Sequence, residues 1–191
     1  KDLDTPIDFD NLISKGSMMG SGGMIVMDED SCMPAVAKFY LEFTQEESCG
    51  KCTPCRVGTT RMLEILDDIC EGRGTMESLN ELKKLSNTIK DTALCGLGQT
   101  APNPVLSTMN AFPDEYIAHV TDKKCPSGVC SKLLSYTIHA DKCKGCTLCS
   151  KVCPAEAITG KVKEVHIILQ DKCIKCGACM SKCKFAAITR G

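Results

Sequence analysis

The chain has 191 residues, a formal net charge of −1 and 16 cysteines. So many cysteines indicate either a disulfide-bonded scaffold or a metal protein. The polar, acidic N-terminus lacks the apolar stretch of a secretion signal, and no apolar run is long enough to cross a membrane. These features favour a metal protein in a reducing, cytoplasmic compartment. The chain begins without methionine, and we expect it to be part of a longer polypeptide.

Charge is divided unevenly along the chain. Residues 125–191 carry 11 Lys and Arg against 4 Asp and Glu, a net of +7, whereas residues 1–124 carry 12 against 20, a net of −8. This asymmetry indicates a boundary between two domains. A basic half can bind nucleic acid, but aromatic residues make up only 4% of the chain and no helical segment carries a basic stripe. We therefore expect no nucleic-acid partner.

Residues 1–27 are expected to be the tail of a preceding domain. They contain a glycine-rich loop followed by a short apolar strand, Met24–Met27. The loop matches neither a G-x-G-x-x-G turn that opens a helix nor a Walker A loop. It is interpreted as close backbone packing at a turn, and its glycines are Gly16, Gly20, Gly22 and Gly23.

Residues 28–120 are predicted to form a small antiparallel helical bundle. A first helix over 31–45 has Ser31 as its cap, Pro34 in its first turn and an apolar face of Val36, Phe39, Tyr40 and Phe43. A second helix ends at 71–74, a third begins at Thr75, and a fourth begins at Pro104 with a continuation over 114–120. The second and third helices carry the apolar stripes Met62, Ile65, Leu66, Ile69, Cys70 and Leu79, Leu82, Leu85, Ile89.

The sequence "ESCGKCTPCR" places Cys49, Cys52 and Cys55 at three-residue spacing within this region. A [4Fe–4S] cluster bound by four thiolates needs one more cysteine. Cys95 follows a predicted helix end in "LCGLG", where glycine lets the backbone approach a cluster closely. Two helices separate it from Cys55 and return the chain to its start. We therefore select Cys95 from the candidates Cys32, Cys70, Cys95, Cys125 and Cys130.

The segment 121–136 is predicted to be a linker and a possible zinc hinge. Two thiols and an imidazole, from Cys125, Cys130 and His119, suit tetrahedral zinc and lack one ligand. Cys32, in the first turn of the first helix, is the preferred fourth ligand, because Cys70 is explained by its apolar stripe. Free thiols or a Cys125–Cys130 disulfide are the alternatives.

Residues 137–191 contain a duplicated sequence, "DKCKGCTLCSKVCPAEAIT" at 141–159 and "DKCIKCGACMSKCKFAAIT" at 171–189. Such duplication implies a pseudo-symmetric module with two equivalent sites. Short strands are expected at 135–139 and 164–169. His139 and His166 in these strands are interpreted as structural or surface residues. Lys184 follows the last cysteine of the second copy, where the first copy has Pro154.

Each copy has the spacing C-x2-C-x2-C-x3-C of bacterial ferredoxins, in which the fourth cysteine ligates the other cluster. Zinc ribbons instead pair two C-x2-C units, so this spacing favours iron–sulfur clusters. The predicted ligand sets are Cys143, Cys146, Cys149 with Cys183, and Cys173, Cys176, Cys179 with Cys153.

The motifs "ESCGKCTPCR" and "LCGLG", together with "GSGGMIVMDED", resemble the flavin-carrying, NADH-oxidising subunit of NADH dehydrogenase over roughly residues 6–112. With the added ferredoxin module, the order of segments most resembles the corresponding subunit of electron-bifurcating, NAD-linked [FeFe] hydrogenases and related formate dehydrogenases. The resemblance implies that residues 1–27 end a ubiquitin-like domain. It also implies that FMN and NAD bind upstream of this segment.

The overall prediction is an α+β chain with three [4Fe–4S] clusters and a candidate zinc site. It would relay electrons between an upstream FMN and other subunits of a redox complex, including a small [2Fe–2S] subunit and a hydrogenase or dehydrogenase subunit, or a soluble ferredoxin. No catalytic residue is predicted. The alternatives are a respiratory-type NADH:quinone oxidoreductase subunit with an extra domain, and a non-redox module in which clusters hold a small fold together.

Overall fold

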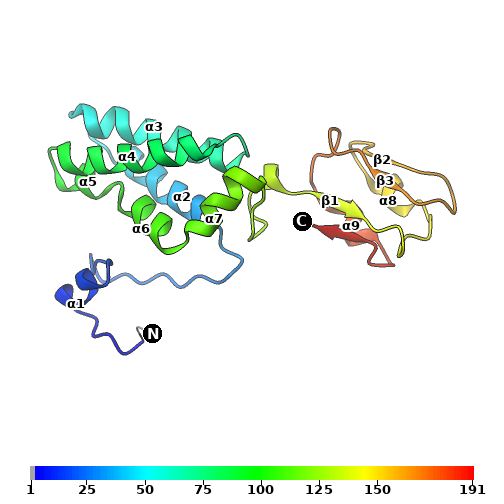
Figure 1. The fold of residues 1–191 in the computed structure, drawn as a ribbon, viewed down its shortest axis with the longest axis horizontal. Coiled ribbons are helices and arrows are strands. Elements are labelled where there is room, and N and C mark those ends of the chain that lie inside the picture. The colour runs from blue at the N-terminus through cyan, green and yellow to red at the C-terminus, as the bar shows by residue number, and fades with distance from the viewer. Residues whose placement is uncertain (1–2) are drawn as a thin grey trace.

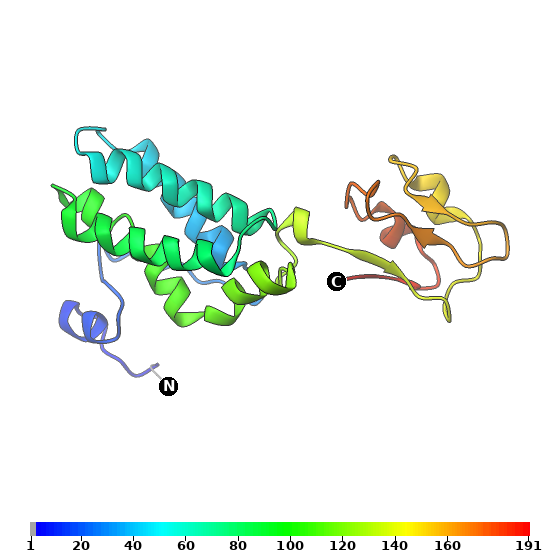
Figure 2. The same ribbon diagram turned by 45° about the horizontal axis from the view of Figure 1, so that its top comes forward.

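The computed structural model describes residues 3–191 and forms two lobes joined by a narrow connection (Figures 1 and 2). The first lobe is helical, and the second consists of short strands, short helices and loops. The helical lobe contains α2 (Met33–Glu46), α3 (Thr53–Cys70), α4 (Met76–Thr92), α5 (Gly96–Thr100), α6 (Asn103–Ala111), α7 (Pro113–Ile117) and the π-helical turn η1 (Ala118–Asp122). A short helix, α1 (Phe9–Ser14), precedes it on an extended segment.

Local sequence explains the helix ends. Pro54 lies in the first turn of α3, where its missing N–H costs no helical hydrogen bond. Gly72 has a φ of 82° just after α3 and allows the chain to turn away. Thr75 caps α4 through a reciprocal pair of hydrogen bonds with Ser78. The predicted start of the third helix at Thr75 is therefore confirmed.

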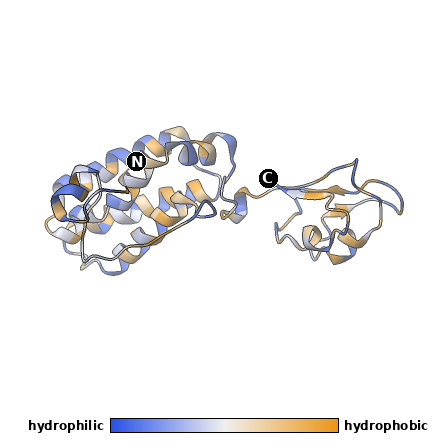
Figure 3. Cartoon of the chain, turned by 90° about the horizontal axis from the view of Figure 1, so that it is seen from below, coloured by the Kyte–Doolittle hydropathy of each residue, from blue (hydrophilic) through white to orange (hydrophobic). Residues whose placement is uncertain are grey.

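The helical lobe has an aliphatic core in which α2 packs on α3 and α6, and α3 packs on α4. The predicted stripes of α3 and α4 point inward, although Leu85 is only partly buried and Cys70 packs against a different buried group. Figure 3 shows hydrophobic and hydrophilic residues on different sides of these helices. The buried residues are Met33, Ala37, Leu41, Met62, Ile65, Leu66, Ile69, Leu79, Leu82, Ile89, Ala93, Val105, Tyr116 and Val120.

The prediction for the first helix is wrong at its cap and on part of its face. Cys32 rather than Ser31 is the N-cap, whereas Val36 packs against the core as predicted. Phe39 and Phe43 are 64% and 59% exposed, and Ala37 and Leu41 are fully buried in their place. These pairs lie on different sides of α2, because a separation of two residues turns a helix by about 200°. The small Ala37 side chain lets α2 approach its neighbours closely, so packing selected the face with less aromatic area.

The predicted strand Met24–Met27 is also absent. Residues 24–27 are extended but pair with no strand of the described chain, and the Val26 side chain is 82% exposed. A strand needs a neighbour to accept its backbone hydrogen bonds. The apolar character of this segment therefore does not suffice to form one here.

The C-terminal lobe is built from two small antiparallel ribbons. Strand β1 (Tyr136–Ile138) pairs with β4 (Ile188–Arg190), and β2 (Ile158–Thr159) pairs with β3 (Ile167–Ile168). The short helices α8 (Leu148–Val152) and α9 (Ala178–Lys182) pack against each other. Each ribbon joins a strand before one sequence copy to a strand at the end of the other, so the two copies fold as one unit.

The connection between the lobes contains the short 3-10 helix η2 (Ser131–Leu133), whose Leu133 is buried beside Gly72 of the helical lobe. The Lys123 ammonium donates a hydrogen bond to the carbonyl of Gly74. In the described part of the chain, no helix has the length and apolar character needed to cross a bilayer.

Candidate iron–sulfur and metal centres

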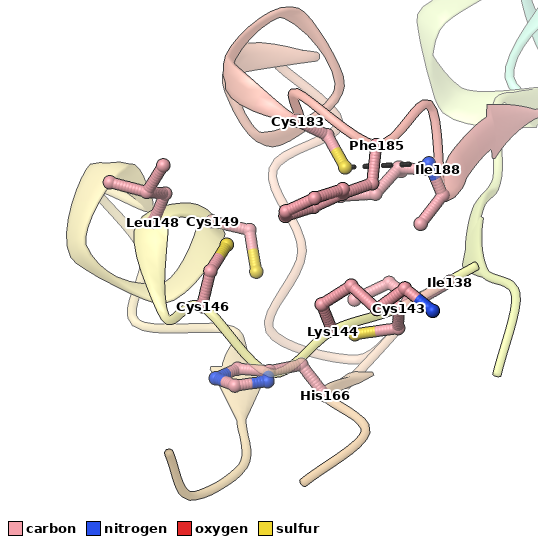
Figure 4. Close-up of a pocket in the computed structure, with 11 residues that line it drawn as sticks. Ile138, Cys143, Lys144, Cys146, Leu148, Cys149, His166, Cys183, Phe185 and Ile188 are labelled. Atoms are coloured by element: carbon pink, nitrogen blue, oxygen red, sulfur yellow. Dashed lines mark hydrogen bonds between the residues drawn. The ribbon is translucent and has the colours of Figure 1, made fainter. Parts of the chain in front are cut away.

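The first cavity of the C-terminal lobe is lined by four cysteines that come from both sequence copies (Figure 4). Cys143 and Cys146 lie in the loop before α8, Cys149 lies in α8, and Cys183 follows α9. The remaining wall is mostly apolar, apart from Lys144 and His166. It includes Ile138, Leu148, Phe185, Ala187 and Ile188.

A second cavity repeats this arrangement with the copies exchanged. Its cysteines are Cys173, Cys176 and Cys179 from the second copy and Cys153 from the first. The other lining residues are Tyr136, Ala157, Ile158, Ile168, Ile174 and Gly177. Each predicted ligand set of the ferredoxin-like module therefore lines one cavity of its own.

The two cysteine loops share unusual backbone positions. Gly145 and Lys175, 30 residues apart, both have positive φ angles, 65° and 59°, and so do Thr147 and Gly177, at 63° and 74°. Left-handed residues at these points turn the backbone sharply between successive cysteines. At Gly145 a side chain is also sterically excluded, because a Cβ atom would lie 2.5 Å from the backbone nitrogen of Glu164.

Backbone amides are directed at the thiols of Cys153 and Cys183, the two cysteines that each line the cavity of the other sequence copy. The N–H of Ala157 donates to Cys153 Sγ at 3.3 Å, and that of Ala187 donates to Cys183 Sγ at 3.4 Å. Hydrogen bonds to sulfur are among the factors that set cluster potentials. Burial, in turn, raises the pKa of Cys149 and Cys179.

In the helical lobe, the two cysteine segments meet at one end of the helices. Cys52 precedes α3 and Cys95 precedes α5. A hydrogen bond from the backbone of Leu94, next to Cys95, lowers the pKa of Cys52. Gly98 packs on Cys55, because a Cβ atom at Gly98 would lie 3.3 Å from that of Cys55. Cys49 and Cys95 are exposed.

A separate cluster of three cysteines and one histidine lies where the two lobes join. The ligand atoms of Cys32, His119, Cys125 and Cys130 all lie within 4.8 Å of one another, and all four residues are buried. The His119 Nε2 atom is 3.3 Å from Cys32 Sγ and 3.4 Å from Cys130 Sγ. These are the four residues grouped from the sequence as a possible zinc site.

The spacing of this group fits one tetrahedral ion. Zinc–sulfur bonds of about 2.3 Å place two sulfurs of a tetrahedron about 3.8 Å apart. The Cys32 and Cys130 sulfurs are 3.6 Å apart. His119 Nδ1 donates to the carbonyl oxygen of Glu115 at 2.7 Å, which fixes the ring and leaves Nε2 facing the sulfurs.

Cys70 has a role that its apolar stripe did not indicate, because it packs against this same buried group. A hydrogen bond with Cys130 and burial raise the pKa of Cys32 far above the ordinary value. The hydrogen bond with Cys32 lowers the pKa of Cys130. The hydrogen bond with Cys70 and burial raise this pKa by more, so the net pKa is raised. Without a metal ion, the thiols of Cys32 and Cys130 therefore stay protonated at neutral pH.

Two cavity residues were not singled out from the sequence. His166, taken as structural or at the surface, is buried and lines the first cavity, and Tyr136 lines the second. They are separated by 30 residues, the same offset that separates Asp141 from Asp171 at the start of each copy. Extending the repeat alignment upstream would have identified the pair.

Comparison with known proteins finds an iron–sulfur family match in each lobe. Residues 35–119 match the NADH-ubiquinone oxidoreductase-F iron-sulfur binding region, and residues 135–184 match the 4Fe-4S dicluster domain. The helical lobe is therefore similar to an iron–sulfur binding region of the NADH-ubiquinone oxidoreductase-F type, and the C-terminal lobe is similar to a 4Fe–4S dicluster domain.

Among individual proteins, the chain is 62% identical over 166 residues to the NADP-reducing hydrogenase subunit HndC of Solidesulfovibrio fructosivorans, covering 87% of this chain and 34% of the relative. It is 40% identical over 124 residues to the F-type subunit of the NADH-quinone oxidoreductase of Mycobacterium bovis, covering 65% and 28%. The chain thus spans about a third of the length of these curated relatives. A solved NAD+-reducing [NiFe]-hydrogenase in the H2-reduced state matches 50% of this chain and 16% of that chain, at 31% identity and a TM-score of 0.48.

Proposed function

We propose that this chain is the electron-relay portion of an NAD(H)-linked flavin and iron–sulfur oxidoreductase subunit. The observation that carries the proposal is the arrangement of twelve cysteines in three sets of four. Two sets line cavities of their own, and the third gathers at one end of the helices. No catalytic residue is assigned, since this segment would move electrons rather than transform a substrate.

The ligand assignments follow these sets. In a helical bundle over 28–120, a [4Fe–4S] cluster would be held by Cys49, Cys52, Cys55 and Cys95. In a ferredoxin-like domain over 137–191, one cluster would be held by Cys143, Cys146, Cys149 and Cys183. The other would be held by Cys173, Cys176, Cys179 and Cys153.

When bound, such clusters supply one-electron redox chemistry. The residues of the chain then have three tasks. Their thiolates hold the iron, backbone amides such as that of Ala187 donate to sulfur, and apolar side chains such as Ile188 limit access of water.

FMN and NAD would bind in the upstream part of the longer polypeptide, with residues 1–27 as the tail of a ubiquitin-like domain there. The partners would be a small [2Fe–2S] subunit and a hydrogenase or dehydrogenase subunit, or a soluble ferredoxin. A hydrogenase-type complex is favoured over the respiratory alternative, because similarity to HndC covers 87% of this chain and similarity to the NADH-quinone oxidoreductase relative only 65%.

The buried Cys32, His119, Cys125 and Cys130 group would bind one zinc ion at the junction, within the linker region 121–136. Its short ligand separations suit a single ion, and its donor set is one that structural zinc sites use. Such a site would fasten the C-terminal lobe to the helical lobe.

Metal analysis of this segment, purified without oxygen, tests the cluster count. Three cubanes require about 12 iron and 12 sulfide per chain. Cys95→Ala should reduce iron to about 8, whereas Cys70→Ala, a matched cysteine outside the cluster sets, should leave it near 12. A native count near 8, unchanged by Cys95→Ala, would remove the cluster from the helical lobe.

Redox titration separates this proposal from the non-redox alternative. In the complete complex, NADH or reduced ferredoxin should reduce the clusters within turnover. Clusters that neither donor can reduce would indicate that they only hold the fold together.

A further inference from the structure

His166 combines deep burial with an unsatisfied polar atom. Its side chain is only 1% exposed, and its Nε2 atom is buried without a hydrogen-bond partner. Among the described residues 3–191, no other buried side-chain nitrogen or oxygen is in this situation. Buried polar groups normally have partners, so this atom points to a missing one.

The surroundings of His166 show where the missing partner would lie. The imidazole lines the first cavity together with Cys143, Cys146, Cys149 and Cys183. Figure 4 shows the ring on one side of this cavity, with Phe185 and Cys183 on the other. A cluster held by these cysteines would present thiolate and sulfide sulfurs, which are hydrogen-bond acceptors.

The imidazole is held in this orientation by its neighbours. Nδ1 lies 3.1 Å from the carbonyl oxygen of Glu164. Gly160 lies against the face of the ring, because a Cβ atom there would come within 2.7 Å of His166 Cγ. With Nδ1 beside this carbonyl and one face covered, Nε2 is the ring nitrogen that has no partner in the described part of the chain.

We propose that His166 donates an Nε2–H hydrogen bond to a sulfur of the cluster held by Cys143, Cys146, Cys149 and Cys183. The inference rests on the proposed function, because it needs a cluster in this cavity. This hydrogen bond would stabilise the reduced cluster and raise its reduction potential.

The second cavity supplies an internal comparison. Tyr136 occupies the position 30 residues before His166 and lines the cavity of Cys173, Cys176, Cys179 and Cys153. Its hydroxyl lies against Gly177, where a Cβ atom would be 2.9 Å away. The equivalent of Gly177 in the first copy is Thr147. The two copies therefore differ in the residue beside the cluster, a phenol in one and an imidazole in the other, and His166 makes the two clusters unequal.

The test is a reduction titration of the full-length protein, followed by electron paramagnetic resonance. His166→Phe keeps an aromatic ring and removes the donor, whereas His166→Gln keeps an N–H group. Tyr136→Phe is the control at the equivalent position. Cys146→Ser, which replaces one thiolate of the first cavity by an alkoxide, assigns the signals to the two clusters.

We expect His166→Phe to lower the potential of the first-cavity cluster by at least a tenfold change in its reduction equilibrium, which is about 59 mV for one electron. His166→Gln should restore at least half of this shift, and Tyr136→Phe should leave the first-cavity potential unchanged. Unchanged potentials in His166→Phe with full iron content would overturn the inference alone.

Two further outcomes are decisive. If His166→Phe and His166→Gln lose iron equally, the residue is merely structural and the inference is wrong. If the wild-type protein contains no reducible pair of clusters in this lobe, the proposed function fails, and the inference fails with it.

Discussion

The two lobes of this chain have different buried cores. The helical lobe buries an aliphatic core in which Met62, Leu66 and Leu82 are fully inaccessible. The buried cluster of the C-terminal lobe has six residues, of which Cys149 and Cys179 are themselves proposed ligands. Small domains that lack a sufficient core usually need metals or disulfides. From this comparison we expect the helical lobe to fold by apolar burial, and the C-terminal lobe to depend on bound clusters.

Removal of iron should therefore produce the largest effect, and it should act on one lobe. After chelation under reducing conditions, we expect the C-terminal lobe to lose its folded structure, because the thiols around the two cavities then lose the bonds that connect them. The helical lobe should retain its helices. Amide hydrogen exchange, resolved by residue, measures both lobes at once. Equal loss of protection in α3 and in β1–β4 would contradict the comparison.

The junction group provides the next test. Cys125→Ser should reduce zinc from about one ion per chain to near zero, because a buried tetrahedral site loses one of its four ligands. Metal analysis by mass spectrometry gives the count, and iron should be unchanged. Cys70→Ser is the matched control, since Cys70 packs beside the group without belonging to it. Absence of zinc from the wild-type chain would remove the site.

Two substitutions in α2 test which side of this helix carries the core. Leu41→Ala should destabilise the helical lobe by about 2–5 kcal/mol, because it leaves a cavity among fully buried side chains. Phe39→Ala should change the free energy of unfolding by no more than about 0.5 kcal/mol, because the ring is largely exposed. Urea unfolding of this segment measures both values. A larger destabilisation by Phe39→Ala than by Leu41→Ala would support the buried face predicted from the sequence.

The smallest expected effect concerns a loop of the C-terminal lobe. Gly145→Ala should destabilise this lobe by about 1–3 kcal/mol, because it places a side chain at a left-handed residue and against the backbone of Glu164. Gly96→Ala is the control, since a Cβ atom there meets nothing within 4 Å. Thermal unfolding of the iron-loaded protein compares the two variants. Equal effects would mean that the tight turn before Cys146 is not needed.

The structure differs most from expectation where a prediction was based only on the order of apolar residues along the chain. For α2, both faces contain apolar residues, so periodicity alone could not choose between Phe39 and Leu41. For residues 24–27, apolar composition predicted a strand, but a strand also requires a neighbour. His166 looked unremarkable because burial and an unsatisfied Nε2 atom are properties of its surroundings.

The sequence by itself determined the cysteine spacing, the duplication over 141–189 and the helix cap at Thr75, because these features act over a few residues of covalently connected chain. Only the tertiary structure decided which face of α2 is buried and where the His166 ring points. It also brought Cys32 to His119, 87 positions away, within 3.3 Å. Such contacts depend on how distant segments pack, which no local pattern encodes.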